Sequence, residues 1–436
     1  MSHSSLKDDR PNIIFLVDCN SFFCSCERLF RPELANKPVG VLSNNDGCFV
    51  SRTKELKALG VPMGAPYFHY KDVCIKNKAF VFSSNFALYA NISDRVMKTL
   101  AEFSDELEVY SVDEAFLNLK GFLPTLRFPT IEDFAVHVKA KVEQNTGIPV
   151  SIGIGPTKTL AKVANQMAKD NLALKGIMSL MNPKVRDTAL ASFEIDDIWG
   201  IGRALAPRLR LLGIKTAKDF RDYSNEKHLL KLFTKVELYR KWELQGISKF
   251  NLNQTSKDKK QIMCSRSFGG QVTTLDELKA SVVHHAASAT EKLRRQNSLC
   301  RSVRVFIRTN RFKNTEQYYG ADEITLDMAT SDTRKIVEAC LKILSSVFVS
   351  GYEYKKSGVC LSGITSSEHS QLSLFEKADT QKSLNLMKSI DLINKKSGQE
   401  TIKFAVSATP KKAWRMNQNL KSPKYVSGWL ELPKVK

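Results

Sequence analysis

The sequence lacks the cysteine and histidine patterns that would bind zinc or form a disulfide framework. Its nine cysteines are odd in number, and no two of them form a Cys-x-x-Cys pair. The seven histidines, with His284 and His285 adjacent, show no zinc-type spacing with those cysteines. We therefore expect a cytoplasmic protein with reduced thiols and no zinc site.

The start of the chain also lacks a long apolar run. Residues 1–11 are mainly polar and charged, and the apolar run at residues 13–17 is too short for a signal-peptide core or a membrane span. We expect neither secretion nor a membrane partner.

Acidic residues are scarce relative to basic ones. The 66 Lys and Arg against 45 Asp and Glu give a net charge of +21, which suits a polyanionic partner better than a small neutral substrate. Residues 1–190 contribute only +3 of this charge (23 basic, 20 acidic), whereas residues 191–436 contribute +18 (43 basic, 25 acidic). The second half is thus expected to bind a phosphate backbone, with a merely solvated basic surface as the alternative.

At 436 residues with 42% hydrophobic content, the chain is long enough for three or four domains. The pattern over residues 13–181 predicts approximately βαββαβ, a split βαβ arrangement whose antiparallel sheet is covered by helices on one face. Many unrelated proteins share this order, so it does not decide function. The expected strands are 13–18, the hairpin 108–119, 149–154 and 177–181, and the expected helices are 21–30, 84–103, 131–145 and 158–169.

A small unit is inserted in this pattern. Strands near 38–42 and 48–51 are expected to form a hairpin that turns at Asn44-Asn45-Asp46-Gly47, followed by a helix over 52–59.

Three carboxylates stand at predicted strand ends. Asp113 and Glu114 are adjacent in the hairpin, and Asp18 ends the first strand. Consecutive strand side chains point to opposite faces, so both hairpin acids can serve one site only if the backbone bends there. The pattern suggests a two-metal site. The alternative is a solvated turn at Asp113 and Glu114 and a helix cap at Asp18.

Residues 192–250 are mainly helical by pattern and contain Gly200 and Gly202, within a segment that resembles a helix-hairpin-helix. Glycines there allow a tight turn that presents amide groups to a phosphate, although an ordinary helical turn would also use them.

A second βαββαβ pattern follows the polar stretch 251–260. Beyond it, residues 376–436 are basic, with 13 Lys and Arg against 5 Asp and Glu, and we expect them to be partly disordered. The elements of the second pattern are strands 261–267, 301–308, 318–326 and 357–362 and helices 275–296 and 331–347.

Several motifs together resemble one family. Asp18-Cys19-Asn20-Ser21-Phe22-Phe23 and Ser111-Val112-Asp113-Glu114-Ala115 resemble the paired signatures of Y-family DNA polymerases, the low-fidelity enzymes that copy damaged templates. Phe30-Arg31-Pro32-Glu33-Leu34, Leu42-Ser43-Asn44-Asn45-Asp46-Gly47-Cys48 and Trp199-Gly200-Ile201-Gly202-Arg203 are similar to the UmuC type, the catalytic subunits of bacterial DNA polymerase V. The resemblance covers the chain from about residue 13 onward.

The resemblance implies an α+β, multi-domain right-hand polymerase with a ferredoxin-like palm, small fingers, a helical thumb with the helix-hairpin-helix, and a βαββαβ little finger. The implied divisions are 1–37 (palm, first part), 38–90 (fingers), 91–190 (palm, second part), 191–250 (thumb), 251–260 (linker), 261–365 (little finger) and 366–436 (C-terminal segment).

It also implies the chemistry. Two Mg²⁺ ions, about 4 Å apart, would activate the primer 3′-hydroxyl and neutralise the leaving group. Asp18 and Asp113 would bridge both ions, Glu114 would hold the one nearer the primer, and the Cys19 carbonyl would complete the other.

Donors to the triphosphate are expected in two places. The amides near Ser21, Phe22 and Phe23 begin a helix next to the metals. The resemblance places Ser51, Lys54 and Lys57 of the fingers and Lys158 of the palm at phosphate-binding positions, with a solvated surface charge as the alternative for each lysine. Lys54 and Lys57 replace the family's usual tyrosine and arginine, which leaves their individual roles open.

Phe23 falls where the family has an aromatic steric gate, a ring that leaves no room for a ribose 2′-hydroxyl. The family often has tyrosine there, but the ring does the excluding, and core packing is the alternative role. Asn20 replaces an acid found in many relatives, which argues against a fourth metal ligand.

In the little finger, Ser265, Arg266 and Ser267 offer hydroxyls, a guanidinium and free backbone near a strand end, which suits phosphates rather than bases. Arg301, Arg304 and Arg308 could line the same groove or a solvated sheet face. Beyond them, Gln371-Leu372-Ser373-Leu374-Phe375 resembles a motif that binds the sliding clamp, unless it forms a buried turn.

We therefore expect an enzyme, a DNA-directed polymerase for translesion synthesis in the bacterial SOS response, cytoplasmic and associated with the nucleoid. No acid-rich exonuclease domain accompanies it, so we expect no proofreading. The implied partners are primer-template DNA, deoxynucleotides, a processed UmuD dimer, RecA and the sliding clamp. The alternatives are a palm-fold nucleotidyl cyclase and a catalytically silent DNA-binding scaffold.

Overall fold

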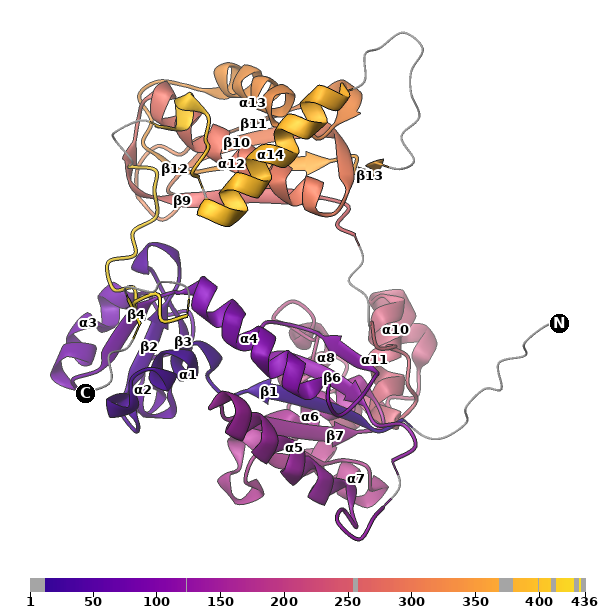
Figure 1. Ribbon diagram of the computed structural model, residues 1–436. Coiled ribbons are helices and arrows are strands. Elements are labelled where there is room, and N and C mark those ends of the chain that lie inside the picture. The colour runs from indigo at the N-terminus through magenta and orange to yellow at the C-terminus, as the bar shows by residue number, and fades with distance from the viewer. Residues whose placement is uncertain are drawn as a thin grey trace. The chain divides into compact units, whose positions relative to one another are not determined.

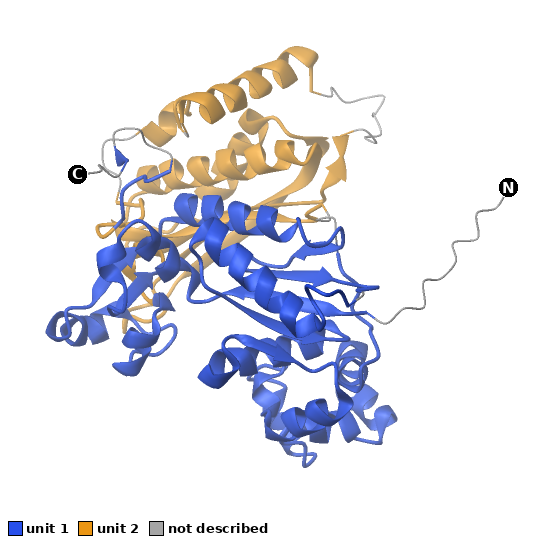
Figure 2. Ribbon diagram, turned by 60° about the horizontal axis from the view of Figure 1, so that its bottom comes forward, with its two compact units in different colours: residues 1–42, 49–256, 421–436 blue, residues 43–48, 257–420 orange. Residues whose placement is uncertain are grey.

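The computed structural model describes residues 12–122, 124–253, 258–367, 379–398, 400–408, 413–426 and 431–432. The chain forms two compact units, one of residues 1–42, 49–256 and 421–436 and one of residues 43–48 and 257–420 (Figures 1 and 2). Both units combine sheets with helices, as the predicted α+β class requires. The clamp-like motif at Gln371, Leu372, Leu374 and Phe375 lies outside the described residues.

A five-stranded sheet, in the order β5-β6-β1-β7-β8, is the centre of the first unit. β1 pairs antiparallel with both β6 and β7, whereas β7 and β8 are parallel. The predicted all-antiparallel sheet is therefore wrong at this edge. The strands are β1 (Ile14–Cys19), β5 (Leu107–Val109), β6 (Glu114–Asn118), β7 (Val150–Gly155) and β8 (Ile177–Ser179).

Helices cover both faces of this sheet, not one face as predicted. Phe15 and Val17 of β1 belong to the core under α4 (Phe86–Leu100) and α5 (Ile131–Thr146). The alternate residues Ile14 and Leu16 pack with Ala161 of α6 (Lys158–Asp170) on the other side. Because helices cover both faces, every residue of β1 is buried, including Asp18 at its end.

The close approach of α6 depends on glycine. A Cβ on Gly153 of β7 would lie 2.1 Å from the Ala161 carbonyl oxygen and 2.2 Å from the Asn165 amide nitrogen. Any larger residue would push α6 off the sheet. Thr157 caps the start of the helix by accepting from the Leu160 amide.

A three-stranded sheet, β3-β2-β4, forms a second region of the first unit. The predicted hairpin is confirmed as β2 (Val39–Leu42) and β3 (Phe49–Arg52). The helix that follows is shorter than predicted, α2 (Lys54–Ala58), and α3 (Tyr67–Lys76) and β4 (Phe80–Ser83) were not predicted. The turn between the two hairpin strands, residues 43–48, belongs to the second unit.

The predicted helical region is confirmed, and its core, in which Leu209, Phe220 and Leu244 are fully buried, also includes apolar residues of α6. Its helices are α7 (Pro183–Ser192), α8 (Ala206–Arg210), α9 (Ala217–Asp222), α10 (Glu226–Leu232) and α11 (Lys235–Gln245). Helix α1 (Phe22–Leu29) packs instead in the core that contains β1.

The second unit contains the second predicted βαββαβ order, as an antiparallel sheet β11-β10-β12-β9. Beyond it, α14 (Gln381–Ser397) is held by Asp391, which pairs with Arg294 at 2.7 Å. Ordered structure in this tail was not predicted. The elements of the sheet unit are β9 (Ile262–Val272), α12 (Leu275–Arg295), β10 (Ser298–Thr309), β11 (Tyr319–Thr330), α13 (Thr333–Val347) and β12 (Tyr354–Ser362). None of the helices in the described parts of the chain is both long and apolar enough to cross a membrane.

Candidate active site

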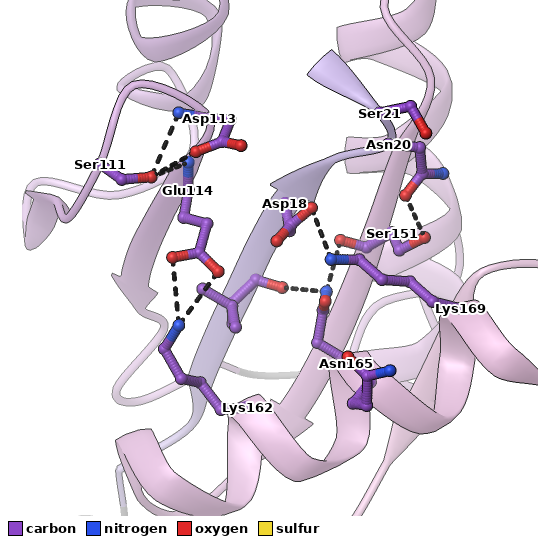
Figure 3. A network of polar contacts seen from close by, with 12 residues as sticks. Asp18, Asn20, Ser21, Ser111, Asp113, Glu114, Ser151, Lys162, Asn165 and Lys169 are labelled. Carbon is purple, nitrogen blue, oxygen red and sulfur yellow. Dashed lines mark hydrogen bonds and ion pairs between the residues drawn. The ribbon is translucent and has the colours of Figure 1, made fainter. Parts of the chain in front are cut away.

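The three predicted carboxylates come together at one end of β1 and β6 (Figure 3). Asp18 and Glu114 are partners in the β1–β6 register, and the Cys19 amide donates to the Asp113 carbonyl at 2.8 Å. The predicted backbone bend is present, because the amides of Tyr110 and Ser111 both donate to the Glu114 carbonyl.

Ser111 stabilises this turn. Its hydroxyl donates to Asp113 Oδ1 at 2.5 Å and accepts from the amides of Asp113 and Glu114 at 3.2 and 3.0 Å. The bend therefore fixes the position of Asp113 relative to the strand end, where an extended strand would have separated the two acids.

Two lysines of α6 neutralise the acids, and neither was predicted from the sequence (Figure 3). Lys169 Nζ lies 2.6 Å from Asp18 Oδ1, and Lys162 Nζ lies 3.0 Å from Glu114 Oε1. In the described parts of the chain, no group of three or more His, Cys, Asp or Glu residues has a metal-binding arrangement. The carboxylates of Asp18 and Glu114 are turned to ammonium groups instead.

The electrostatics of Asp18 are set by its burial and by the two charges beside it. Burial raises the pKa of this carboxyl to about 7, although Lys169 lowers it, and the neighbouring Glu114 raises it further. A buried carboxylate such as that of Asp18 is stabilised in its charged form by positive charge nearby. The oxygen ligands of Asp18, Asp113 and Glu114 are those that Mg²⁺ prefers, so this donor set fits a divalent ion.

The start of α1 lies beside these acids in the chain. Ser21 takes a left-handed conformation (φ 47°), and its hydroxyl donates to the Arg52 carbonyl at 2.9 Å. Asn20 Oδ1 accepts from the Ser151 hydroxyl at 2.9 Å, which gives this side chain a structural role. Phe22 is buried in the core, and Phe23 is only half-buried.

The chain is similar in sequence to known proteins over most of its length. The model of the impB/mucB/samB family matches residues 17–166, and the model of that family's C-terminal domain matches residues 259–374. Protein SamB and protein UmuC of Salmonella typhimurium are each 39% identical to the chain, over 97% of it and 99% of their own length. The chain is a Y-family DNA polymerase of the UmuC type.

More distant proteins extend the comparison. DNA polymerase IV of Bacillus velezensis is 28% identical over 90% of the chain and 92% of its own length. The solved structure of a Y-family DNA polymerase chimera shares the fold, with a TM-score of 0.63 and 20% identity over 81% of this chain and 99% of the other. Residues 385–435 match a domain of unknown function. Family membership decides for a DNA polymerase over the cyclase and the silent scaffold.

The geometry of this polymerase does not support the role predicted for Lys158. That side chain is buried, with Nζ 2.9 and 2.7 Å from the two carboxylate oxygens of Glu108. Glu108 also accepts from the Asn253 amide at 2.8 Å. Lys158 is therefore held in a buried ion pair with Glu108, whereas Lys162 and Lys169 are the lysines of α6 that lie at the predicted acids.

The predicted fingers residues differ in their surroundings. Ser51 is buried, and its hydroxyl accepts from the Cys24 amide at 3.4 Å, so it supports α1. Lys54 and Lys57 are exposed on α2.

The two glycines of the predicted helix-hairpin-helix are not equivalent. Gly200 has φ 85°, and a Cβ there would lie 2.2 Å from the Arg240 guanidinium. A Cβ on Gly202 would have no atom of the described residues within 4 Å, so packing does not require glycine there. Trp199, which precedes Gly200, donates to the Tyr110 hydroxyl at 3.1 Å, close to the acidic turn.

In the second unit, the strand register separates the predicted DNA-binding residues. Ser265 pairs with Gly358 and Ser267 with Lys356, which in turn pair with Phe306 and Arg308 of β10. Cross-strand partners share a face, so the two serines lie on the face of Phe306 and Arg308 and of Arg304, four residues before Arg308. Arg301 lies at the register shift itself, between Cys300 and Ser302.

Arg266 lies on the opposite face, because its partner is Ser357, whose hydroxyl contacts Ser281 of α12. The expected free backbone is also partly occupied, since the Gly269 amide donates to the Arg415 carbonyl at 3.1 Å. The predicted trio of Ser265, Arg266 and Ser267 is thus not one binding surface.

Proposed function

We propose that this polymerase adds deoxynucleotides to a primer opposite damaged template bases, by two-metal phosphoryl transfer, in the bacterial SOS response. The observation that carries the mechanism is the meeting of Asp18, Asp113 and Glu114 at one end of β1 and β6. We assign the palm to residues 1–37 and 91–190, the fingers to 38–90, the thumb to 191–250 and the little finger to 261–365.

In this proposal the three carboxylates and the Cys19 carbonyl hold two Mg²⁺ ions. Such ions would supply charge that lowers the pKa of the primer hydroxyl and neutralises the leaving pyrophosphate. Asp18 and Asp113 would serve as ligands to both ions, and Glu114 would serve as a ligand at the primer end. No protein side chain is assigned as general base.

Lys169 takes the part that the sequence had suggested for Lys158. Its ammonium group lies at Asp18, with 29% of the side chain exposed, and is able to turn towards a triphosphate once the acids are neutralised. The amides at the start of α1, near Phe22 and Phe23, and the exposed Lys54 and Lys57 complete the donors to the phosphates. The Phe23 ring excludes a ribose 2′-hydroxyl.

The remaining partners belong to the same proposal. Primer-template DNA is bound through phosphates by the thumb glycines and the little finger, the clamp binds the segment from Gln371 to Phe375, and a processed UmuD dimer and RecA complete the assembly. UmuC is the name of a relative 39% identical to this chain, which is what suggests those two partners. The polymerase would act in the cytoplasm, at the nucleoid.

Primer extension tests the proposal, with partner proteins supplied. Asp113→Asn should abolish extension, whereas Asp105→Asn, an exposed acid of the same region, should leave it unchanged. Equal activity of wild type and Asp113→Asn would refute the metal assignment, and formation of a cyclic nucleotide without extension would refute polymerase activity.

A further inference from the structure

Phe23 is held by two aromatic residues of α4. Its ring stacks on Tyr89, with centroids 4.5 Å apart and planes at 14°, and meets Phe86 edge-on at 5.9 Å and 90°. Such offset and edge contacts fix the position of a ring more sharply than apolar burial alone. The position of the Phe23 ring therefore depends on the first turn of α4.

Tyr89 is in turn fixed by a buried carboxylate. The Tyr89 hydroxyl donates to Glu27 Oε1 at 2.7 Å, and both side chains are completely buried. Glu27 lies one helical turn after Phe23 on α1, so the stack and the hydrogen bond join the same two helices at neighbouring points. Burial raises the pKa of Glu27, while the hydrogen bonds from Tyr89 and Ser422 lower it.

The third member of this network comes from the other end of the chain. The Ser422 hydroxyl donates to Glu27 Oε1 at 3.1 Å and accepts from Asn85 Nδ2 at 3.0 Å. Asn85 immediately precedes α4, and its amide group also reaches the Pro423 carbonyl at 3.3 Å. Ser422 thus connects the buried carboxylate to the start of the helix that carries Phe86 and Tyr89.

Neighbouring residues hold Ser422 in place. Lys421 forms a parallel bridge with Ser83 at the end of β4, and the Tyr425 ring stacks on Phe30 with centroids 4.6 Å apart and planes at 6°. Residues 421–426 therefore pack against α1 and the start of α4 within the first unit. They fall inside the domain of unknown function matched over residues 385–435.

We propose that residues 421–426 are a positioning element for the Phe23 ring, and that Ser422, through Glu27, Asn85 and Tyr89, determines how strictly the polymerase selects deoxyribose over ribose. The inference rests on the proposed role of Phe23 as the steric gate. Ser422 is a buried positioning residue that acts through its contacts with Glu27 and Asn85. Its effect is on the choice of sugar, because the chain of contacts ends at the ring and not at the carboxylates.

The test is single-nucleotide incorporation by the full chain, with a deoxynucleotide and the matching ribonucleotide. Ser422→Ala removes the hydrogen bonds of this hydroxyl to Glu27 and from Asn85, and should lower the ratio of the two efficiencies roughly three- to tenfold, within the net strength of two such bonds. Deoxynucleotide incorporation should stay within about twofold of wild type. Lys424→Ala, an exposed residue of the same segment, is the matched control and should leave the ratio unchanged.

A second variant separates positioning from folding. Glu27→Gln keeps an acceptor for Tyr89 and Ser422 and should retain more of the sugar selection than Glu27→Ala does. An unchanged ratio in Ser422→Ala, or an equal loss with both sugars, would overturn the inference. Phe23→Ala tests the steric gate separately. It should lower the ratio of deoxynucleotide to ribonucleotide incorporation more than any other variant, and an unchanged ratio there would reject the proposed role of Phe23.

Discussion

Lys169 Nζ and Asp18 Oδ1 are 2.6 Å apart, so a lysine occupies the position at this carboxylate where the proposed mechanism would need a metal ion. We expect the site to have a metal-free and a metal-bound state. In the metal-free state the ammonium group of Lys169 stabilises the buried carboxylate of Asp18, and in the metal-bound state it would be available to bind a phosphate. Each state has a measurable consequence.

The stability of the metal-free protein should depend on pH through Asp18. Its folded pKa is raised to about 7, against an unfolded value near 3.9, so the folded state favours the protonated acid. Ionised Asp18 therefore lowers the free energy of unfolding. The reduction is absent below pH 4, increases between pH 4 and pH 7, and above pH 7 is constant at no more than about 4 kcal/mol. Asp18→Asn should therefore raise the free energy of unfolding at pH 8 in a chelator, but not at pH 4.

Denaturant unfolding with and without Mg²⁺ checks this prediction. Mg²⁺ should stabilise the wild type at pH 8 and leave Asp18→Asn much less affected, with Asp105→Asn behaving as wild type. A gain in Asp18→Asn that is independent of pH would show that the effect is not electrostatic.

Lys169 should matter for nucleotide binding. Lys169→Ala removes a charged donor to the triphosphate, which should raise the KM for the deoxynucleotide roughly ten- to a hundredfold. Lys184→Ala removes an exposed lysine of α7 and is the control. Steady-state incorporation measures the KM of both variants. An unaltered KM in Lys169→Ala would show that another residue binds the triphosphate.

Lys158 should matter for folding. Lys158→Met leaves Glu108 buried without its partner, which should lower the free energy of unfolding by about 3–5 kcal/mol. The double variant Lys158→Met/Glu108→Gln should recover much of that loss, because glutamine is neutral and still accepts from the Asn253 amide. Recovery of stability with an unchanged KM would confirm a structural role, while a raised KM in the stable double variant would contradict it.

The sequence suggested Lys158 as the lysine near the acids, whereas the structure has Lys169 at Asp18. Local sequence patterns could not distinguish the two residues. The two residues lie eleven positions apart on one helix, about 16 Å along its axis, on nearly the same side. Helical periodicity alone does not tell which end of α6 meets the acids. The strand pairing does, because β7 runs antiparallel to β1 and ends at Ile14, so α6 starts at the far end of the sheet and runs back towards Asp18.

Some other features could have been predicted from the sequence, and one could not. The run from Ile13 to Val17 is apolar at every position, which indicates a strand buried on both faces and could have predicted that helices cover both sides. The acids could be predicted because Asp18 stands at the end of the first strand and Asp113 and Glu114 stand on a short hairpin. The contact of Ser422 with Glu27 spans 395 residues and involves one serine in a basic tail, so no periodicity or motif pointed to it.

The two faces of the second sheet should differ in their contribution to DNA binding. Arg304 and Arg308 share a face with Ser265 and Ser267, while Arg266 lies on the helix-covered face. If the shared face contacts phosphates, Arg304→Gln/Arg308→Gln should weaken primer-template binding and lower the slope of log affinity against log salt by up to about 2.

Arg266→Gln removes one charge from the same strand on the other face, so it separates a specific surface from the general effect of net charge. Its salt slope should stay near that of the wild type, and the loss in the double variant should be similar for unrelated DNA sequences, since phosphates carry no sequence information. Equal slopes in all three proteins would place the DNA contacts elsewhere, and a lower slope in Arg266→Gln alone would restore the surface that the sequence had predicted.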